Sequence, residues 1–466
     1  ENPATLTIDD NKNVTAEFTA PTYNINFVVK DEANNPIEGA TVSINSQDKV
    51  TDSNGETNLS VNAGTYSYTV SYGDFNEVNN NIEVNQNTTE NVIMFYYAST
   101  VTELNSALEN STVSIINLDN DEYDLSSSSS AVNGVKTLKS GSSSIVYLNI
   151  DQDYTSITTQ DFVSMKHLVD GNLTTNINRV LGLETIINGD LIITAGNLDI
   201  NSQNLTISGS ILQRGGTLNV NEGNIEVNSD YIIEEEDGSR ADAFLQMIKT
   251  ADHITVDGNF LMNSAWSHSD KLTEGILEIK GDFTEKYNYQ SSATHTNFHA
   301  TGNHKVILSG SGAQSVSFET HSSGTSCFAN LELNNTGSLE FASKTVFTGN
   351  LVNNLSSEPV NVTNLYPAGT ATFNSGLSNE GEWPWDLAVY ENVTLAQDIS
   401  IGGNYYLLGN CTVDAAGYTV DIGGNFYQRL GTFNVNGSTV NIVGDYIIED
   451  EDESCANATI QMANTA

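Results

Sequence analysis

Two runs of adjacent carboxylates are the residues of this sequence whose types and spacing point most directly to chemistry. Each run follows the strand-like motif YII; the first comprises Glu234, Glu235, Glu236 and Asp237, and the second comprises Glu449, Asp450, Glu451, Asp452 and Glu453. Adjacent carboxylates repel one another, and Ca²⁺, which takes about six to eight oxygen ligands, would relieve that repulsion. Neither run has the Asp-x-Asp-x-Asp-Gly spacing of a dedicated calcium loop. A Ca²⁺ site and a solvated acidic loop both remain open, and no other cofactor is predicted.

Histidines form a second candidate site. Three of the 7 histidines, His295, His299 and His304, fall within the segment ATHTNFHATGNH. A loop that brought them together could hold Zn²⁺ or Cu²⁺. Side chains alternate along a strand, however, so a strand would place His295 and His299 on one face and His304 on the other. The alternative interpretation is that they are surface or turn histidines.

The elements that must position these residues show up as a short repeat. A glycine, a polar residue and then an apolar or aromatic residue recur at Gly189, Gly209, Gly258, Gly281, Gly349, Gly403, Gly424 and Gly444. Several of the gaps are 20 or 21 residues, a period typical of a solenoid. Short β-type runs lie between the turns without helical periodicity, so each coil should hold three strands. The aromatic residues that follow the turns should stack inside the coils rather than bind sugars; they are Phe260, Phe283, Tyr405, Phe426 and Tyr446.

A longer repeat is superimposed on the short one. The segment QRGGTLNVNEGNIEVNSDYIIEEED from Gln213 matches QRLGTFNVNGSTVNIVGDYIIEDED from Gln428 at an offset of 215 residues. This match predicts a tandem array whose second copy is cut off at Ala466. Asparagines at matching places are expected to form amide ladders inside the coil turns; they are Asn219, Asn221, Asn434 and Asn436.

Composition excludes several classes of function. With 59 acidic and 16 basic residues the net charge is −43, and such a chain repels nucleic acids and acidic lipid head groups. No apolar stretch approaches the roughly 18 residues that a membrane helix needs, and the first residues lack the pattern of a signal peptide. The three cysteines, Cys327, Cys411 and Cys455, form no CxxC motif. We therefore expect no nucleic-acid partner and no direct membrane insertion.

Residues 22–97 alternate as a compact all-β unit of about seven short strands. The motifs NPIEGATVSI, TDSNGET and AGTYSYTVSYGDF resemble the carboxypeptidase-regulatory-like and Cna-B-like Ig-type modules of bacterial surface proteins. In residues 1–21, ATLTIDDNKNVTAEF resembles the last hairpin of an internalin-type B repeat. These resemblances imply a truncated β repeat module and an Ig-like sandwich that act as spacers outside a prokaryotic cell.

A short helix marks the start of the third region, residues 98–466. In TELNSALEN, Leu104 and Leu108 lie four residues apart behind a cap-like Thr102, and a strand follows. This order resembles the start of right-handed parallel β-helices of the pectate-lyase type, in which a helix covers the first coil. The resemblance implies an all-β chain: an Ig-like sandwich, a capping helix and a long right-handed parallel β-helix of about 12 to 16 coils.

Enzymatic activity is not predicted. Polysaccharide lyases and hydrolases of this fold need a base beside a Ca²⁺ cluster, or paired acids about 5–10 Å apart, and neither pattern is evident. Arg214 and Arg429, two of only four arginines, match across the long repeat, which favours a structural role. We predict an extracellular cell-surface structural or adhesion protein, a stiff stalk with a cell-surface or glycan ligand. A self-associating filament or surface layer and a carbohydrate-active enzyme are the alternatives.

Overall fold

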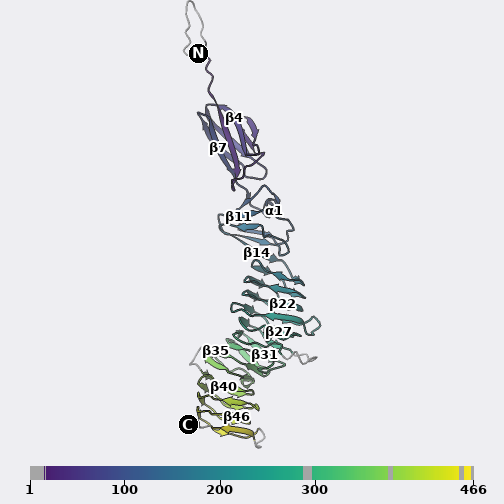
Figure 1. Ribbon diagram of the computed structural model, residues 1–466, viewed down its shortest axis with the longest axis vertical. Coiled ribbons are helices and arrows are strands. Elements are labelled where there is room, and N and C mark those ends of the chain that lie inside the picture. The colour runs from purple at the N-terminus through teal and green to yellow at the C-terminus, as the bar shows by residue number, and fades with distance from the viewer. Residues whose placement is uncertain (1–14, 16, 287–295, 376–380, 451–455, 463–466) are drawn as a thin grey trace, which may run out of the picture. The chain divides into compact units, whose positions relative to one another are not determined.

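The computed structural model describes residues 15, 17–286, 296–375, 381–450 and 456–462, and it divides into two compact units, residues 1–165 and 166–466 (Figure 1). The hairpin expected in residues 1–21 falls largely outside the described residues, and residues 17–21 form no strand. Of the helices in the described part of the chain, none has the length and apolarity that crossing a bilayer requires.

An Ig-like sandwich of two sheets opens the first unit. One sheet has the order β4-β1-β7 and the other the order β3-β2-β5-β6. Alternation along the strands sends Ile25, Phe27 and Val29 of β1 inward with no exposed surface, so the sandwich core follows from the period-2 pattern. The strands are β1 (Thr22–Asp31), β2 (Thr41–Ile44), β3 (Gln47–Val50), β4 (Glu56–Asn62), β5 (Gly64–Ser71), β6 (Val78–Val84) and β7 (Thr88–Met94).

Helix α1 (Val101–Glu109) is the only α-helix among the described residues. Its N-cap is Thr100 rather than the predicted Thr102: the Thr100 side chain accepts from the backbone N–H of Glu103, and the Glu103 carboxylate accepts from the N–H of Thr100. This capping box satisfies two N–H groups that the helix cannot use internally. Leu104, Ala107 and Leu108 are buried, as the predicted amphipathic pattern requires.

The first parallel coils complete this unit. β8 (Tyr97–Ala98) pairs with β9, and the side chain of the fully buried Lys136 donates to the carbonyls of Asn110 and Val113 just after helix α1. Glu32 of the sandwich accepts from the side chains of Lys139 at 2.6 Å and Asn117 at 2.9 Å. The coil strands are β9 (Ile115–Leu118), β10 (Glu122–Leu125), β11 (Lys136–Ser140), β12 (Ser144–Leu148) and β13 (Ile157–Thr159).

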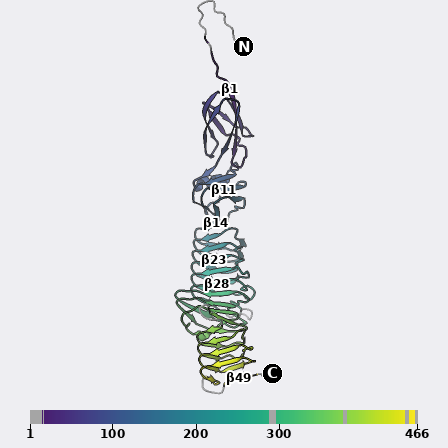
Figure 2. The same ribbon diagram turned by 90° about the vertical axis from the view of Figure 1, so that its left-hand side faces the viewer.

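The second unit is a solenoid of stacked parallel strands (Figure 2). One sheet follows the order β14 (Val163–Val169), β17 (Thr185–Ile187), β20 (Asn204–Ile207), β23 (Asn224–Val227), β26 (His253–Val256), β28 (Ile276–Ile279), β30 (Lys305–Leu308), β32 (Asn330–Leu333), β35 (Asn350–Asn353) and β37 (Thr372–Ser375). A second follows β15 (Leu173–Thr175), β18 (Leu191–Ile193), β21 (Ile211–Gln213), β24 (Tyr231–Ile233), β27 (Phe260–Met262), β29 (Phe283–Glu285), β31 (Ala313–Phe318) and β33 (Ser338–Phe341). A third contains β16 (Arg179–Val180), β19 (Asn197–Asp199), β22 (Gly215–Asn219) and β25 (Asp242–Gln246).

The later coils of this unit form three further four-stranded sheets. The first contains β38 (Glu382–Trp383), β41 (Ile399–Ile401), β44 (Thr419–Ile422) and β47 (Thr439–Ile442), and the second β39 (Leu387–Val389), β42 (Tyr405–Leu407), β45 (Phe426–Gln428) and β48 (Tyr446–Ile447). The third contains β40 (Val393–Thr394), β43 (Thr412–Asp414), β46 (Leu430–Asn434) and β49 (Asn457–Gln461). Between the two sets, β34 (Thr345–Phe347) pairs with β36 (Leu365–Pro367), beside the 3₁₀ turn Val362–Asn364.

The recurrent glycine-polar turns form one continuous column in the first coils of this unit. The backbone N–H of Ser210 donates to Oδ1 of Asp190 at 2.8 Å, and the same bond links Asn259 to Asp230 at 2.7 Å and Asp282 to Asn259 at 2.8 Å. Glycine precedes the polar residue at most of these turns, with Ser229 in its place before Asp230; at Gly209, a Cβ would lie 2.3 Å from that Oδ1 of Asp190. The repeated motif is thus a side-chain ladder that holds each turn to the previous coil.

The aromatic ladder lies inside the coils, as predicted. Phe260 and Phe283 have no exposed surface and stack with their ring centroids 5.6 Å apart, and Phe426 lies 5.0 Å from Tyr405 and 4.9 Å from Tyr446.

The asparagine ladder was predicted less accurately. Asn219 and Asn221 are half-buried at the turn rather than internal, and both donate to the carboxylate of Asp199 in the preceding coil.

The fold class predicted from the sequence is confirmed: the chain is all-β, with an Ig-like domain, a short helix and a parallel β-solenoid of about 16 turns. The solenoid interior is apolar because the period of the coils returns the same residue type to the same inward place. Cys327 and Cys411 are free thiols, whereas Cys455 lies outside the described residues.

Candidate functional site

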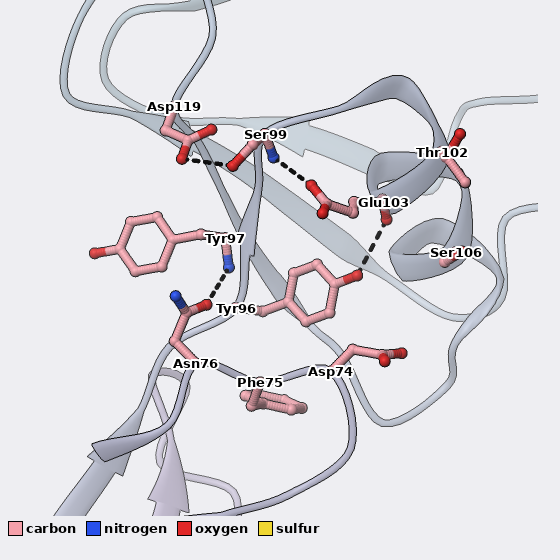
Figure 3. Close-up of a pocket in the computed structure, with 10 residues that line it drawn as sticks. All are labelled: Asp74, Phe75, Asn76, Tyr96, Tyr97, Ser99, Thr102, Glu103, Ser106 and Asp119. Carbon is pink, nitrogen blue, oxygen red and sulfur yellow. Dashed lines mark hydrogen bonds between the residues drawn. The ribbon is translucent and has the colours of Figure 1, made fainter. Parts of the chain in front are cut away.

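A groove of about 660 Å³ lies in the first unit (Figure 3). The turn between β5 and β6 forms one side, the segment after β7 its floor, and helix α1 the other side. The lining residues are Asp74, Phe75, Asn76, Tyr96, Tyr97, Ser99, Thr102, Glu103, Ser106 and Asp119.

Local hydrogen bonds fix the groove's walls. The turn closes where the N–H of Phe75 donates to the carbonyl of Tyr72 at 3.0 Å, and Gly73 supplies the positive φ of 47° that the turn needs. The N–H of Asn76 then donates to the carbonyl of Phe95 at 2.9 Å, and its side-chain oxygen accepts from the N–H of Tyr97 at 3.3 Å. The turn is therefore held against the floor of the groove.

Aromatic rings form the floor. Tyr96 is only 3% exposed; its ring packs edge-on against Phe75 at 5.8 Å and its hydroxyl donates to the carbonyl of Glu103 at 3.1 Å. Burial raises the pKa of Tyr96, and the negative charges of Asp74 and Glu103 raise it further. The neighbouring ring of Tyr97 is 42% exposed and is open to a ligand.

Three carboxylates give the groove its charge. Glu103 accepts from the N–H groups of Ser99 at 2.8 Å and Thr100 at 3.0 Å, and Asp119 accepts from the Ser99 hydroxyl at 2.8 Å, whereas Asp74 lies on the opposite wall (Figure 3). None of the lining residues is a lysine or an arginine. The groove thus offers hydrogen-bond acceptors and an aromatic face, and it suits a ligand rich in hydrogen-bond donors.

The structure separates the members of the first acidic run. Glu234 is paired: its carboxylate accepts from Nζ of Lys286 at 2.8 Å and from the amide of Asn263 at 2.9 Å. Asp237 is exposed, and hydrogen bonds from Ser239 lower its pKa. Glu235 lies between them, half-buried, and Glu236 is exposed.

In the second run, Glu449 and Asp450 are exposed, while Glu451, Asp452 and Glu453 lie outside the described residues. Within the described ranges, no three histidine, cysteine, aspartate or glutamate side chains are grouped so that they could hold a metal ion. Arg214 donates to the backbone carbonyl of Glu234 at 2.7 Å, so this repeated arginine ties one coil to the next.

The two described histidines of the segment ATHTNFHATGNH, His299 and His304, lie in different surroundings. His304 has no exposed surface and its ring lies 6.0 Å from that of Phe298, whereas His299 is half-buried with Nδ1 3.1 Å from the Ser269 hydroxyl. Burial lowers the pKa of His304 to about 3, so its ring is neutral. The expectation of a surface or turn residue is wrong for His304, and His295 lies outside the described residues.

Sequence reasoning missed a polar cluster around Glu391. Its carboxylate accepts from the hydroxyl of Ser323 at 2.5 Å and from that of Tyr366 at 3.4 Å. Tyr366 is 2% exposed and its hydroxyl lies 3.3 Å from Nδ1 of His321; burial and then the charge of Glu391 raise its pKa. Nearby, the Lys344 ammonium lies 3.7 Å above the ring of Tyr390. The only signal in the sequence is that the 20-residue spacing of the turns breaks down between Gly281 and Gly403.

The groove was also missed, because its residues share no motif. Asp74, Tyr97 and Asp119 come from a sandwich turn, a short strand and a coil turn, and only the fold brings them together.

Comparison with known proteins identifies one part of the chain. Residues 24–95 match the family model of the carboxypeptidase regulatory-like domain. No curated protein matches the chain. The predicted resemblance of the sandwich to carboxypeptidase-regulatory-like modules is therefore confirmed, and the chain carries an Ig-type domain of this kind followed in the sequence by a β-solenoid.

Proposed function

We propose that the chain is an extracellular, cell-surface structural protein, a stiff solenoid stalk that presents a binding surface and carries out no catalysis. The observation that carries the proposal is the side-chain ladder along the turns. Successive coils of the second unit are held together by strand pairing and, at turns such as those of Ser210 and Asn259, by a bond from a turn N–H to an aspartate side-chain oxygen of the earlier coil. A stack with these added cross-links resists bending and unravelling.

Charge and domain type support the same proposal. The net charge of −43 keeps neighbouring stalks apart in solution. An Ig-type domain matching the carboxypeptidase regulatory-like family suits a spacer outside a cell, and the resemblance of residues 1–21 to an internalin-type B repeat adds a second spacer to the proposal. We further propose that the solenoid is of the right-handed, pectate-lyase type.

The contacts of the repeated arginine favour a structural protein over a carbohydrate-active enzyme. A lyase base must face its substrate, but Arg214 uses Nη1 to bind the carbonyl of Glu234. Its partner in the long repeat, Arg429, follows Gln428 as Arg214 follows Gln213. An arginine that binds the backbone of the next coil, as Arg214 does, favours a structural role.

Pulling single molecules of the full chain by its two ends tests the mechanical part of the proposal. Each coil of 20 residues should release about 70 Å when it unravels, so we expect a series of steps of that size at high force. Extension at low force without steps would contradict it.

Labelling intact source cells with an antibody raised against the chain tests the location. The antibody should bind intact cells, and digestion of the cells with an impermeant protease should abolish the binding.

A further inference from the structure

We propose that the groove between the Asp74–Asn76 turn and helix α1 binds a glycan whose sugars carry free ammonium groups. The proposal deepens the proposed function, because it assigns the surface that the stalk presents. The groove lies wholly within the first unit, and its volume of about 660 Å³ falls in the usual range of roughly 300–1,000 Å³ for ligand sites.

Charge complementarity is the first argument. Three carboxylates, Asp74, Glu103 and Asp119, line the groove, and no lysine or arginine lines it. The helix cap uses Oε2 of Glu103, and the Ser99 hydroxyl uses Oδ2 of Asp119, so the groove keeps further acceptor oxygens on Asp74, Glu103 and Asp119. The charge of −43 on the whole chain draws cationic ligands toward it.

The aromatic face is the second argument. The Tyr97 ring, 42% exposed, lies between Asn76 and Asp119 (Figure 3). A flat aromatic ring packs against the C–H face of a sugar, and an ammonium group is attracted to the same ring. An ammonium beside Tyr97 would then reach the carboxylate of Asp119.

The hydroxyl groups favour a glycan over a basic peptide. Thr102 and Ser106 of helix α1 are exposed on the groove wall, and neither side chain makes a hydrogen bond within the described residues. These groups both donate and accept, which matches the hydroxyls of a sugar. A lysine-rich peptide would use the carboxylates alone.

Calorimetric titration of the full chain at low salt tests the proposal with three probes: a β-1,4-linked glucosamine tetramer, its N-acetylated counterpart and tetralysine. We expect the glucosamine tetramer to bind at least tenfold more tightly than the other two, and its binding to weaken as salt is added. Equal binding of the N-acetylated tetramer would overturn the need for the ammonium groups. Tighter binding of tetralysine would mean that the groove selects positive charge alone, and it would overturn the proposal that the ligand is a glycan.

Variants locate the site. Asp74→Asn combined with Asp119→Asn, and Tyr97→Ala separately, should each weaken binding of the glucosamine tetramer about tenfold or more. Asp48→Asn combined with Glu83→Gln, which removes the same two charges at exposed positions of strands β3 and β6, is the matched control for the double variant and should leave binding unchanged. Circular dichroism checks that each variant is folded, and Tyr97→Phe, which keeps the ring, should retain binding. Weaker binding in the control, or unchanged binding in Tyr97→Ala, would overturn the assignment of the site to the groove. Stepwise unravelling under force does not depend on ligand binding. A negative binding result would therefore overturn the glycan site without affecting the proposal of a stiff stalk.

Discussion

The hydroxyl of Tyr231 donates a hydrogen bond to Oε1 of Gln213 at 2.7 Å, and neither side chain has any exposed surface. Nε2 of Gln213 donates in turn to the carbonyl of Phe244 at 2.9 Å. The second copy of the long repeat has the same arrangement: Tyr446 donates to Gln428, which donates to the carbonyl of Thr459 at 2.9 Å. A buried amide is tolerated in this apolar interior because its donor and acceptor are both satisfied.

Tyr231→Phe should lower the free energy of unfolding by about 1–3 kcal/mol, because it leaves Oε1 of Gln213 buried without a donor. Burial raises the pKa of Tyr231 well above its ordinary value, so the hydroxyl remains a donor throughout the usual pH range. Urea denaturation of the full chain measures the change. The control is Tyr446→Phe in the second copy, where the half-buried tyrosine should give a smaller loss. Equal losses would contradict the role of burial.

Gly209→Ala should destabilise the solenoid by about 1–3 kcal/mol, since the new Cβ would meet Oδ1 of Asp190 at 2.3 Å and force the ladder apart. Gly182→Ala is the matched control, because a Cβ there has nothing within 4 Å. The control should be neutral or stabilising by up to about 1 kcal/mol. Thermal unfolding compares the two variants. A similar change in both would show that the ladder of turn residues does not contribute to stability.

Acid should weaken the fold through His304. Its pKa is about 3 in the folded chain against an ordinary value of 6.5, so between these values the unfolded chain binds a proton that the folded chain does not. Its contribution is therefore fully present above pH 6.5 and is lost as the pH falls toward 3, with a slope of up to about 1.4 kcal/mol per pH unit.

His304→Leu isolates this contribution. Neither ring nitrogen of His304 has a hydrogen-bond partner in the described residues, so leucine should keep the stability measured at pH 7.5 while flattening its fall between about pH 6.5 and 4. Urea denaturation at several pH values gives both curves. Parallel curves for the two proteins would assign the acid sensitivity to other groups.

Calcium is tested by thermal unfolding of the full chain with and without millimolar Ca²⁺, with bound metal counted afterwards. Because Lys286 already neutralises Glu234, we expect the midpoint to stay within about one degree. A rise of several degrees that disappears when residues 234–237 and 449–453 are neutralised would instead make the acidic runs calcium sites.

The sequence predicts what repeats and misses what does not. The ladder of Phe260 and Phe283 was predictable because a fixed period returns an aromatic residue to the same inward place. The pairing of Glu234 with Lys286 was not, since the partners lie 52 residues apart and meet only through the stacking of coils. His304 was placed on the opposite face from its neighbours, but its complete burial depends on Phe298 and the surrounding rings.

The groove could not be predicted from the sequence for the same reason. Asp74, Tyr97 and Asp119 are unremarkable in the sequence, because each follows the local rules of a turn or a strand. Their proximity is a property of how a sandwich turn, a helix cap and a first coil are joined, and no local pattern records that.

The ladder of turn residues gives the solenoid a chemical polarity. At Asn172, Asp190, Asp230 and Asn259 the side-chain oxygen belongs to the earlier coil and the accepted N–H to the later one. A finished coil thus exposes ready acceptors toward its C-terminal side, and the following turn supplies the matching donor. At these turns, a chain that folds from its N-terminus therefore meets an acceptor already in place when the next coil is laid down.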